Sequence, residues 1–335
     1  MKRKYKVFDY CWHIPHQWDM IRALRNDCEF YYCLTVFTGW DTSKRPLPPE
    51  INFVTHYEPG FYDVAILHLD QDMVIPDTKK RMIYEHFNSV INDIPKTVIN
   101  HASPVIPEYF AGTGHSISDE EAERRCKDII RELVGKNVMV VNSHTAATDR
   151  EWGFGIPIVH GMDAEEWLDL PKEPRIFTAL CPLGSETYYN RKRMFEVSDI
   201  LEEQYGYYLQ YARMNVDTGN SWESYRQYLG KSLLYIDTSF RTPMNRARTE
   251  AFLSGCCVIQ VEGAHDLERW AKDGENIILV PDDSQKIASV IAELLHGGYQ
   301  KAVQTGQKGK EMAIKEFNPE RYRRDWLELL QNVTG

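Results

Sequence analysis

The chain has 335 residues, of which 43% are hydrophobic and 26% are charged. This length is enough for two domains of ordinary size, and the composition is that of a folded protein rather than a disordered chain. Asp and Glu outnumber Lys and Arg by 49 to 39, which gives a formal net charge of −10. That charge argues against a broad electrostatic grip on nucleic acid or on an anionic membrane, although it leaves room for a local basic cleft.

Targeting signals are not evident in the sequence. No apolar run approaches the ~18 residues of a membrane span. The basic start, MKRK, is not followed by an apolar run of signal-peptide length. The seven cysteines are an odd number without metal-type spacing. We therefore expect a cytoplasmic protein with free thiols and no membrane span.

Strand and helix patterns alternate through the first half of the chain, which predicts a parallel sheet in an α/β domain. Strands are expected at residues 4–11, 29–37, 62–69, 96–100 and 137–142, and helices at 16–26, 77–92, 118–134 and 143–151. The helix at 118–134 opens with a capping box, Ser118-x-x-Glu121.

The stretch 153–163, GFGIPIVHGMD, interrupts this alternation and is taken as a domain boundary. A second α/β series follows it. Its strands are expected at 175–181, 207–213 and 232–236 and at two places within 241–281, and its helices at 190–205, 222–229, 284–296 and 299–317 and from Pro319 onward. We expect an N-terminal domain at 1–158, a C-terminal domain at 159–316, and a final helix at 317–335.

Ligands of parallel α/β sheets bind beyond the carboxyl ends of the strands. Two such domains on a short linker place a cleft between them, and the loops that follow strands face it. The loops expected to matter are residues 11–17, 101–107, 182–190 and 237–245.

The stretch 241–281 begins its helix in a way that local rules disfavour. Arg246 and Arg248 fall in or beside the first helical turn, where the helix dipole repels cations, and Arg241 lies just upstream. A bound anion accounts for this arrangement, because free backbone N–H groups and the dipole already favour one there. The alternative is a surface pair between Arg246 and Glu250, although Glu before Arg is the better order for such a pair.

Residues 248–260, RTEAFLSGCCVIQ, resemble the donor-site signature of retaining nucleotide-sugar glycosyltransferases of the GT-B fold (group 1, family-four-like). Residues 273–281, DGENIILVP, are similar to a second conserved segment of that family. Residues 159–163, VHGMD, resemble its interdomain segment, and residues 317–322, FNPERY, its closing helix. The resemblance covers about residues 140–330, whereas the first 135 or so match in architecture alone.

The resemblance implies two Rossmann-like domains that face an interdomain cleft, with a C-terminal helix crossing back to the N-terminal domain. The N-terminal domain would bind the acceptor and the C-terminal domain a nucleotide diphosphate sugar. Transfer would retain the configuration: the diphosphate leaves on the front face and takes the proton of the acceptor hydroxyl. The resemblance implies neither an enzyme nucleophile nor a required metal or other cofactor.

The resemblance also assigns donor residues. Glu250 stands where the family has a glutamate that binds the ribose, and the helix N–H groups would meet the diphosphate. Thr242 stands where the family commonly has a second glutamate near the transferred sugar, so the sugar is left open. The expected donor contacts beside Glu250 are Arg241, Thr242, Asn245, Arg246, Arg248 and Thr249.

A second donor element is expected after the first strand of the C-terminal domain, where the family often has a glycine and a basic pair. Gly184, Arg191 and Lys192 occupy this part of the chain. Arg191 and Lys192 would neutralise the charge that builds on the leaving diphosphate. The alternative is a solvated, charged start to a helix, and the sequence does not tell which of Arg191, Lys192 and Arg193 faces the cleft.

Histidines follow two strands of the N-terminal domain. Some family members have a histidine near the reacting sugar in the region of His101, which implies a contact to a sugar hydroxyl or to the acceptor; the alternative is a residue that caps the loop. His13 and His16 follow the first strand and, with Trp12, are assigned to the acceptor. A metal pair at His13 and His16 is rejected because no third ligand lies at a suitable spacing.

Other reaction classes lack their motifs. The sequence has no G-x-x-x-x-G-K-[ST] loop, no G-x-S-x-G elbow and no G-x-G-x-x-G after the first strand. Two alternatives to a transferase remain: a non-catalytic nucleotide-sugar-binding protein and a GT-B nucleotide-sugar epimerase. The acceptor is open among a glycan, a small molecule and a modified nucleic acid.

Overall fold

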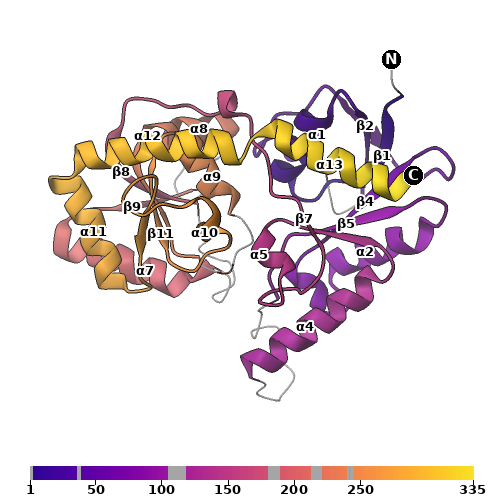
Figure 1. The fold of residues 1–335 in the computed structure, drawn as a ribbon, viewed down its shortest axis with the longest axis horizontal. Helices are drawn as coiled ribbons and strands as arrows, with labels where there is room; N and C mark the ends of the chain where they lie inside the picture. Colours follow the sequence, from indigo (N-terminus) through magenta and orange to yellow (C-terminus); the bar gives the residue numbers. More distant parts are fainter. Residues whose placement is uncertain are drawn as a thin grey trace. The chain divides into compact units, whose positions relative to one another are not determined.

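The structure is a computed structural model that describes residues 3–35, 39–104, 118–179, 189–212, 221–239, 241 and 245–335. The chain divides into two compact units (Figure 1). Unit 1 comprises Met1–Gly161 and Pro319–Gly335, and unit 2 comprises Met162–Asn318. The chain passes between units after residues 161 and 318, compared with the expected boundaries at 158 and 316.

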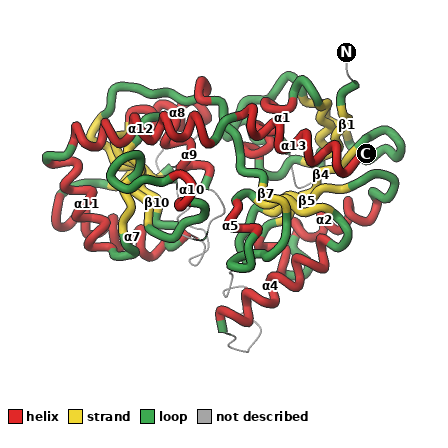
Figure 2. The backbone as a smooth tube through the Cα atoms, viewed as in Figure 1, coloured by secondary structure: helices red, strands yellow, loops and turns green. Residues whose placement is uncertain are grey.

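Among the described residues of unit 1, seven parallel strands form one sheet in the order β3-β2-β1-β4-β5-β6-β7. The strands are β1 Tyr5–Tyr10, β2 Cys28–Cys33, β3 Ile51–Val54, β4 Val64–Leu69, β5 Lys96–Asn100, β6 Val138–Val141 and β7 Ile156–Pro157. The helices are α1 Ile14–Leu24, α2 Lys79–Val90, α4 Asp119–Val134, α5 His144–Ala147 and α13 Pro319–Thr334, with a 3₁₀ turn at Gln71–Val74. Helices and strands alternate along the chain (Figure 2), as the sequence predicts.

Among the described residues of unit 2, five parallel strands pair in the order β12-β11-β10-β8-β9. They are β8 Glu173–Thr178, β9 Leu209–Tyr211, β10 Ser232–Asp237, β11 Cys257–Val261 and β12 Ile278–Val280. The helices are α7 Arg191–Ile200, α8 Trp222–Lys231, α9 Arg246–Leu253, α10 Leu267–Trp270, α11 Ser284–His296 and α12 Tyr299–Glu316. A 3₁₀ turn at Ala164–Glu166 precedes β8, and a π-helical turn at Leu201–Tyr205 continues α7.

Each sheet has one place where the order of successive strands changes direction, which we call the chain reversal. In unit 1, β1 leads to β2 on one side and β4 leads to β5 on the other, so the reversal lies between the adjacent strands β1 and β4. In unit 2 the same reversal lies between β8 and β10. Helices that leave in opposite directions open a crevice at the carboxyl ends of such strands, and ligands of α/β sheets bind there.

The central strands are buried on both faces, which explains why they appear in the sequence as continuous apolar runs. All six residues of β4 and all six of β10 are buried. Helix α13 completes the core of unit 1: it buries Tyr322, Trp326 and Leu330 and contacts α1 (Figure 1). Arg323 on its outer side makes a bidentate ion pair with Asp27, with N–O distances of 2.7 and 2.9 Å.

Two strands of unit 1 were not expected from the sequence. β3 pairs beside β2 at one edge of the sheet and has no buried residue, so the alternation that marks a half-buried strand is missing. β7 has two residues, and its Pro157 lies on the opposite edge of the sheet, where proline is tolerated. The predicted boundary at 153–163 therefore includes the last strand of the first sheet.

The predicted ends of some helices and strands were wrong by a few residues. Helix α1 begins at Ile14 rather than at residue 16, because the side chain of His13 caps it by accepting a hydrogen bond from the backbone N–H of His16. The predicted helix 143–151 ends at Ala147. The strand expected at 29–37 ends at Cys33, and residues 36 and 37 of that expectation lie outside the described part of the chain.

The capping box predicted at Ser118 is half confirmed. The Ser118 hydroxyl accepts from the backbone N–H of Glu121, as expected, and the Glu121 carboxylate accepts from Arg124 and Arg125. Six cysteines in the described ranges are free thiols and buried. None of the helices in these ranges combines the length and the apolar character that crossing a bilayer requires.

Candidate functional site

The loop after β10 in unit 2 is organised by a buried carboxylate. Asp237, the last residue of β10, is 0% exposed. Its carboxylate accepts from the backbone N–H of Ser239 at 2.9 Å and from the side-chain amide of Asn245 at 2.8 Å. Burial raises the pKa of Asp237, and the charge of Arg248 acts in the opposite direction. Asp237 thus ties the start of this loop to the residue that begins α9.

Asn245 is the N-cap of α9, since its side-chain oxygen accepts from the backbone N–H of Ala247 at 3.0 Å. Its amide nitrogen is the donor to Asp237. Asn245 therefore caps the helix, a role for which asparagine is strongly preferred, and also binds the aspartate at the start of the loop. Among the other predicted donor contacts, Thr249 is buried and Arg241 is half-buried, whereas Gly184 and Thr242 lie outside the described residues.

Arg248 lies inside unit 2. Its side chain donates to Gln260 Oε1 at 2.8 Å, and its guanidinium carbon lies 5.1 Å from the centre of the Trp270 ring. Gln260 in turn donates to the backbone oxygens of Asp237, at 3.1 Å, and Ser239, at 2.7 Å. Burial lowers the pKa of Arg248, while the charge of Asp237 raises it. These contacts make Arg248 a brace for the loop after β10.

Glu250 lies in α9 with 5% of its surface exposed. Its Oε2 accepts from the hydroxyl of Tyr225 at 2.7 Å, and its Oε1 is 4.0 Å from Arg246. The Arg246–Glu250 pair therefore exists, but its side chains are 12% and 6% exposed, so it is not the surface pair considered from the sequence. Tyr225 comes from α8, and local sequence patterns did not point to it.

The residues at the basic start of α7 differ in their contacts and in their exposure to solvent. Asn190 precedes the helix without a side-chain capping bond, and its amide donates to Thr238 O at 3.3 Å, which links the segments that follow β8 and β10. Arg193 binds Asp282 at 2.7 Å and anchors the helix. Lys192 has a side-chain exposure of 80% and lies 3.9 Å from Glu196. Arg191, the first helical residue, is half-buried.

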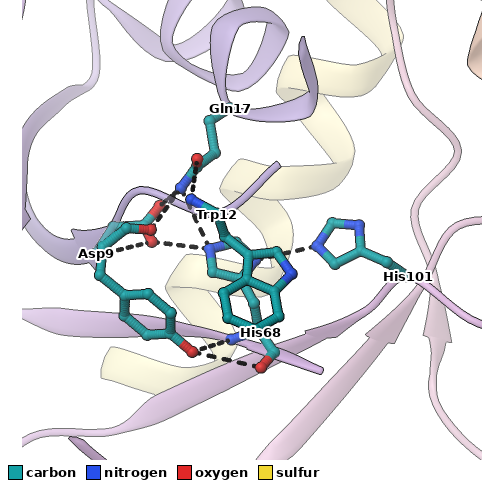
Figure 3. Close-up of polar contacts among 6 residues, drawn as sticks. Asp9, Trp12, Gln17, His68 and His101 are labelled. Carbon is teal, nitrogen blue, oxygen red and sulfur yellow. Dashed lines mark hydrogen bonds and ion pairs between the residues drawn. The ribbon is translucent and has the colours of Figure 1, made fainter. Parts of the chain in front are cut away.

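In unit 1 a carboxylate and two imidazoles lie at the reversal between β1 and β4 (Figure 3). Asp9 of β1 and His68 of β4 both have 0% exposure, and His68 Nε2 is 2.8 Å from Asp9 Oδ1. His68 Nδ1 is 3.0 Å from Nε2 of His101, the residue that follows β5. The chain of contacts therefore runs from the core to a half-buried histidine at the carboxyl edge of the sheet.

Gln17 of α1 holds the carboxylate of Asp9 from the other side (Figure 3). Its amide nitrogen donates to Asp9 Oδ2 at 3.1 Å and to Tyr10 O at 2.9 Å. Its amide oxygen accepts from Trp12 N at 2.9 Å. The backbone N–H of Tyr10 donates to Asp9 Oδ1 at 2.6 Å. The buried charge is thus compensated by directed donors, as a buried carboxylate requires.

The histidines and tryptophan predicted for this unit lie together. The ring of His13 is exposed and nearly parallel to that of His101, at 11° and 5.4 Å between centres. His16 is 2% exposed, lies edge-on to His101 at 5.1 Å, and has its Nε2 3.4 Å from the hydroxyl of Tyr322 in α13. Trp12 lies parallel to His68, at 5° and 6.1 Å.

Three members of this cluster were missed from the sequence: Asp9, Gln17 and His68. A signal for His68 existed, because it is a polar residue within the apolar run 62–69 that the pattern assigns to a buried strand. Within the ranges that the structure describes, no group of three or more His, Cys, Asp or Glu side chains is arranged to hold a metal ion. The roles predicted for the site residues stay predictions.

Solved structures with the same fold extend over the whole chain. HepE from Anabaena, in complex with UDP and glucose, superposes with a TM-score of 0.64 at 14% identity, covering 98% of this chain and 100% of HepE. Sucrose-phosphate synthase from Thermosynechococcus elongatus gives a TM-score of 0.64 at 14% identity, with coverages of 98% and 99%. An apo structure of OtsA gives 0.61 at 11% identity, with coverages of 98% and 99%.

No protein-family model matches the sequence, and no curated protein matches it. Identities of 11% and 14% establish an architecture and do not transfer a substrate. The two parallel-sheet units, their strand orders and these superpositions show that the chain has the GT-B fold.

Proposed function

We propose that this protein is a glycosyltransferase that moves a sugar from a nucleotide diphosphate sugar to an acceptor hydroxyl with retention of configuration. The observation that carries the proposal is the position of Glu250. Its carboxylate is buried in the helix that follows β10, beside the chain reversal of unit 2. A carboxylate with two acceptor oxygens suits the two hydroxyls of a ribose.

The first turn of α9 suits the diphosphate. Its backbone N–H groups and dipole favour an anion, and Arg241 and Arg246 add positive charge to the same segment. In our proposal Arg191 and Lys192, at the start of α7 across the reversal, stabilise the charge on the leaving diphosphate. Arg248 and Asn245 contribute through the loop that they brace, and Thr249, Thr242 and Gly184 complete the proposed donor set.

Structures of HepE in complex with UDP and with UDP-glucose support a uridine nucleotide as the first donor to test. In our proposal unit 2 binds the donor and unit 1 the acceptor, with Trp12, His13 and His16 on the acceptor side and His101 at the reacting sugar. The leaving diphosphate takes the proton of the acceptor hydroxyl, so the reaction proceeds without an enzyme nucleophile and without a metal. A cytoplasmic location is part of the same proposal.

Donor binding is tested first. A panel of nucleotide sugars, beginning with UDP-glucose, is screened by thermal shift, since a ligand at a hundred times its Kd stabilises the folded state by about 2.7 kcal/mol. Calorimetry then compares wild type with Glu250→Ala. A hydrogen bond to a charged group contributes about 1.5–3 kcal/mol, so affinity should fall roughly 10- to 150-fold.

Glu203→Ala is the matched control, because Glu203 is an exposed carboxylate of the same unit. It should leave the affinity for the donor unchanged. Equal affinities of wild type and Glu250→Ala would contradict the ribose assignment. The stereochemical claim is tested separately by following the anomeric proton of the product by NMR, where an inverted product rejects retention.

Thr242 favours a second candidate function. Threonine replaces the glutamate that the resembling family commonly places near the transferred sugar. A protein without that group can bind a nucleotide sugar without transferring it. Slow hydrolysis of the donor, or transfer to any acceptor, excludes a purely binding role.

A further inference from the structure

Two helices of unit 2 carry the pair of side chains at the centre of the proposed donor site. Tyr225 belongs to α8 and Glu250 to α9, and the hydroxyl of Tyr225 donates to Glu250 Oε2 at 2.7 Å. Because the two residues belong to different helices, this bond forms only if α8 and α9 are held at the right separation. The groups that hold the helices together therefore set the position of the carboxylate.

One segment of unit 2 contacts both helices. It comprises residues 163–172, and we call it the entry segment because the chain enters unit 2 just before it. The carbonyl of Glu166 accepts from the side chain of Arg226 in α8 at 2.7 Å. The backbone N–H of Leu170 donates to Gly230 O, in the last turn of the same helix, at 3.2 Å. The entry segment is thus bound to α8 at two places.

Trp167 of the entry segment packs beside Tyr225. It is buried, and its ring lies edge-on to that of Tyr225, at 83° with 6.3 Å between the ring centres. The ring of Tyr225 also lies 6.0 Å from that of Phe177 in β8, which is buried as well. Contacts with two large rings in a close-packed interior restrict the rotation of the tyrosine side chain. They limit the directions in which its hydroxyl can point.

Lys172, the last residue of the entry segment, joins the carboxyl ends of the two helices. Its side chain is 5% exposed. Its Nζ donates to Gly230 O of α8 at 2.7 Å and to the carbonyl of Ser254, the C-cap of α9. The last carbonyls of a helix have no partner within the helix, and a cation suits the negative end of the helix dipole. One ammonium group therefore fixes the end of α8 to the end of α9.

The entry segment lies directly against both helix ends. A Cβ atom on Gly230 would lie 2.5 Å from the carbonyl oxygen of Leu168. A Cβ atom on Gly255, the residue after the C-cap of α9, would lie 2.5 Å from Asp169 Oδ1. Both separations are steric clashes, so glycine at each position permits the close approach. Asp169 also pairs with Lys172 at 3.3 Å, which keeps the ammonium group in place.

We propose that Lys172 and Trp167 are positioning residues that set the Tyr225–Glu250 pair by holding α8 against α9. Lys172 acts through the helix ends and Trp167 through the ring of Tyr225, and neither touches the donor. The inference rests on the proposed function for the role of Glu250 in donor binding, and on the contacts above for the positioning. It follows that the entry segment contributes to donor affinity, although it is not one of the loops that follow strands.

Lys172→Met removes the ammonium group and keeps a long unbranched side chain. Calorimetry with UDP-glucose, or with another nucleotide sugar that binds wild type, should show a roughly 2- to 12-fold loss of affinity, the value of one misplaced hydrogen bond. In the Glu250→Ala background the same substitution should change the affinity little, because the group on which it acts is gone. Lys272→Met, at an exposed lysine of unit 2, should change nothing. No loss, or an equal loss with and without Glu250, would overturn the proposal.

Trp167→Leu decides the matter if Lys172→Met does not fold. It removes the ring beside Tyr225 and leaves the helix ends joined by Lys172. Donor affinity should fall in the same range, and in steady-state kinetics the KM for the donor should rise more than kcat falls. Trp167→Phe keeps an aromatic ring and should restore most of the affinity. Equal donor affinities of wild type and Trp167→Leu would contradict the role of this residue.

A measurement without ligand separates the positioning from the proposed function. In protein labelled with ¹³C at the tyrosine Cζ atoms, Tyr225→Phe identifies the NMR resonance of Tyr225. Lys172→Met and Trp167→Leu should each move this resonance, and more in the presence of Glu250 than in the Glu250→Ala background. The resonance of Tyr57, which donates to the carboxylate of Asp93 in unit 1, should stay in place.

The two kinds of failure are then distinct. If wild type binds no nucleotide sugar while the Tyr225 resonance moves as expected, the proposed function fails and the positioning role stands. If the donor binds while neither substitution moves the resonance, the positioning role is wrong and the proposed function stands.

Discussion

The two chain reversals, one in each unit, have the same topology, but a different side chain accompanies the buried aspartate in each. Both contain a buried aspartate near the end of a central strand, Asp9 in β1 and Asp237 in β10, and both aspartates accept a backbone N–H of the chain that follows. In unit 1 the aspartate contacts the imidazole of His68. In unit 2 it lies in the field of the buried guanidinium of Arg248. In both units the aspartate accepts from the backbone, and the partner side chain differs: an imidazole in unit 1 and a guanidinium in unit 2.

This difference suggests a division of chemistry between the units. Imidazoles can donate to or accept from hydroxyl groups, whereas a helix start with arginines suits a diphosphate. A GT-B enzyme needs both kinds of recognition. Each partner can be removed in turn by substitution, and the variants below run from the largest expected effect to the smallest.

Arg248→Met should have the largest effect, on stability. It leaves Gln260 Oε1 without its donor and removes the cation that offsets the buried charge of Asp237. Loss of one member of a buried charged pair costs about 3–5 kcal/mol in the free energy of unfolding. Urea denaturation measures the loss, and Arg269→Met on the exposed surface should stay within ~0.5 kcal/mol.

A second substitution tests whether the charges of Arg248 and Asp237 are coupled. Asp237→Asn in the Arg248→Met background removes the unbalanced carboxylate charge. The double variant should therefore be more stable than Arg248→Met alone. Equal stability of the two would show that the two charges are not coupled.

Gln17→Leu should have the corresponding effect in unit 1, and a smaller one. It leaves Trp12 N and Tyr10 O without their side-chain partner and removes one donor to Asp9. An unsatisfied buried polar group costs about 1–3 kcal/mol. Thermal and urea unfolding measure it, with Gln285→Leu, at an exposed glutamine of unit 2, as the control. Unchanged stability would show that water or a rearranged side chain replaces Gln17.

Tyr225→Phe tests the residue that orients Glu250. It removes the 2.7 Å hydrogen bond while keeping the ring that packs near Trp167 and Phe177. A net contribution of about 0.5–1.5 kcal/mol corresponds to a roughly 2- to 12-fold loss of donor affinity in calorimetry. Tyr228→Phe, on the same helix, is the control. Tighter donor binding in Tyr225→Phe would mean that Tyr225 competes with the ribose for Glu250.

Lys192→Ala should have the smallest effect on the fold. Its side chain is 80% exposed, and its 3.9 Å pair with Glu196 is a surface ion pair of little energetic value. The free energy of unfolding should change by less than ~0.5 kcal/mol. Any fall in the rate of sugar transfer is then a direct effect on the reaction. A rate equal to that of wild type, together with a fall in Arg191→Ala, would assign the leaving-group contact to Arg191.

Much of the fold was predictable because its signals are local. Long apolar runs marked β4 and β10, and helical periodicity marked α11 exactly where it lies, at Ser284–His296. The edge strands β3 and β7 were missed because neither has the buried, alternating pattern on which such a prediction depends. Sequence patterns reveal a strand through its buried residues, and short edge strands have few buried residues.

The candidate site was predictable only where its residues are close in sequence. The segment from Asn245 to Glu250 was identified by its own helix start and by the family pattern of residues 248–260. The contact between Asp9 and His68 joins residues 59 positions apart, and that between Tyr225 and Glu250 joins residues 25 positions apart. No local spacing encodes such pairs, because the strand order of the sheet creates them.

Helix α13 has a consequence for the order in which the protein is made. It belongs to unit 1, yet it is translated after all of unit 2. A ribosome therefore releases every residue of unit 2 before Tyr322 and Trp326, which are 0% exposed in unit 1, become available. Unit 1 therefore cannot complete its core until α13 is available, and part of its apolar surface stays uncovered until then. A chaperone that binds the nascent chain would find its substrate in the unit that was made first.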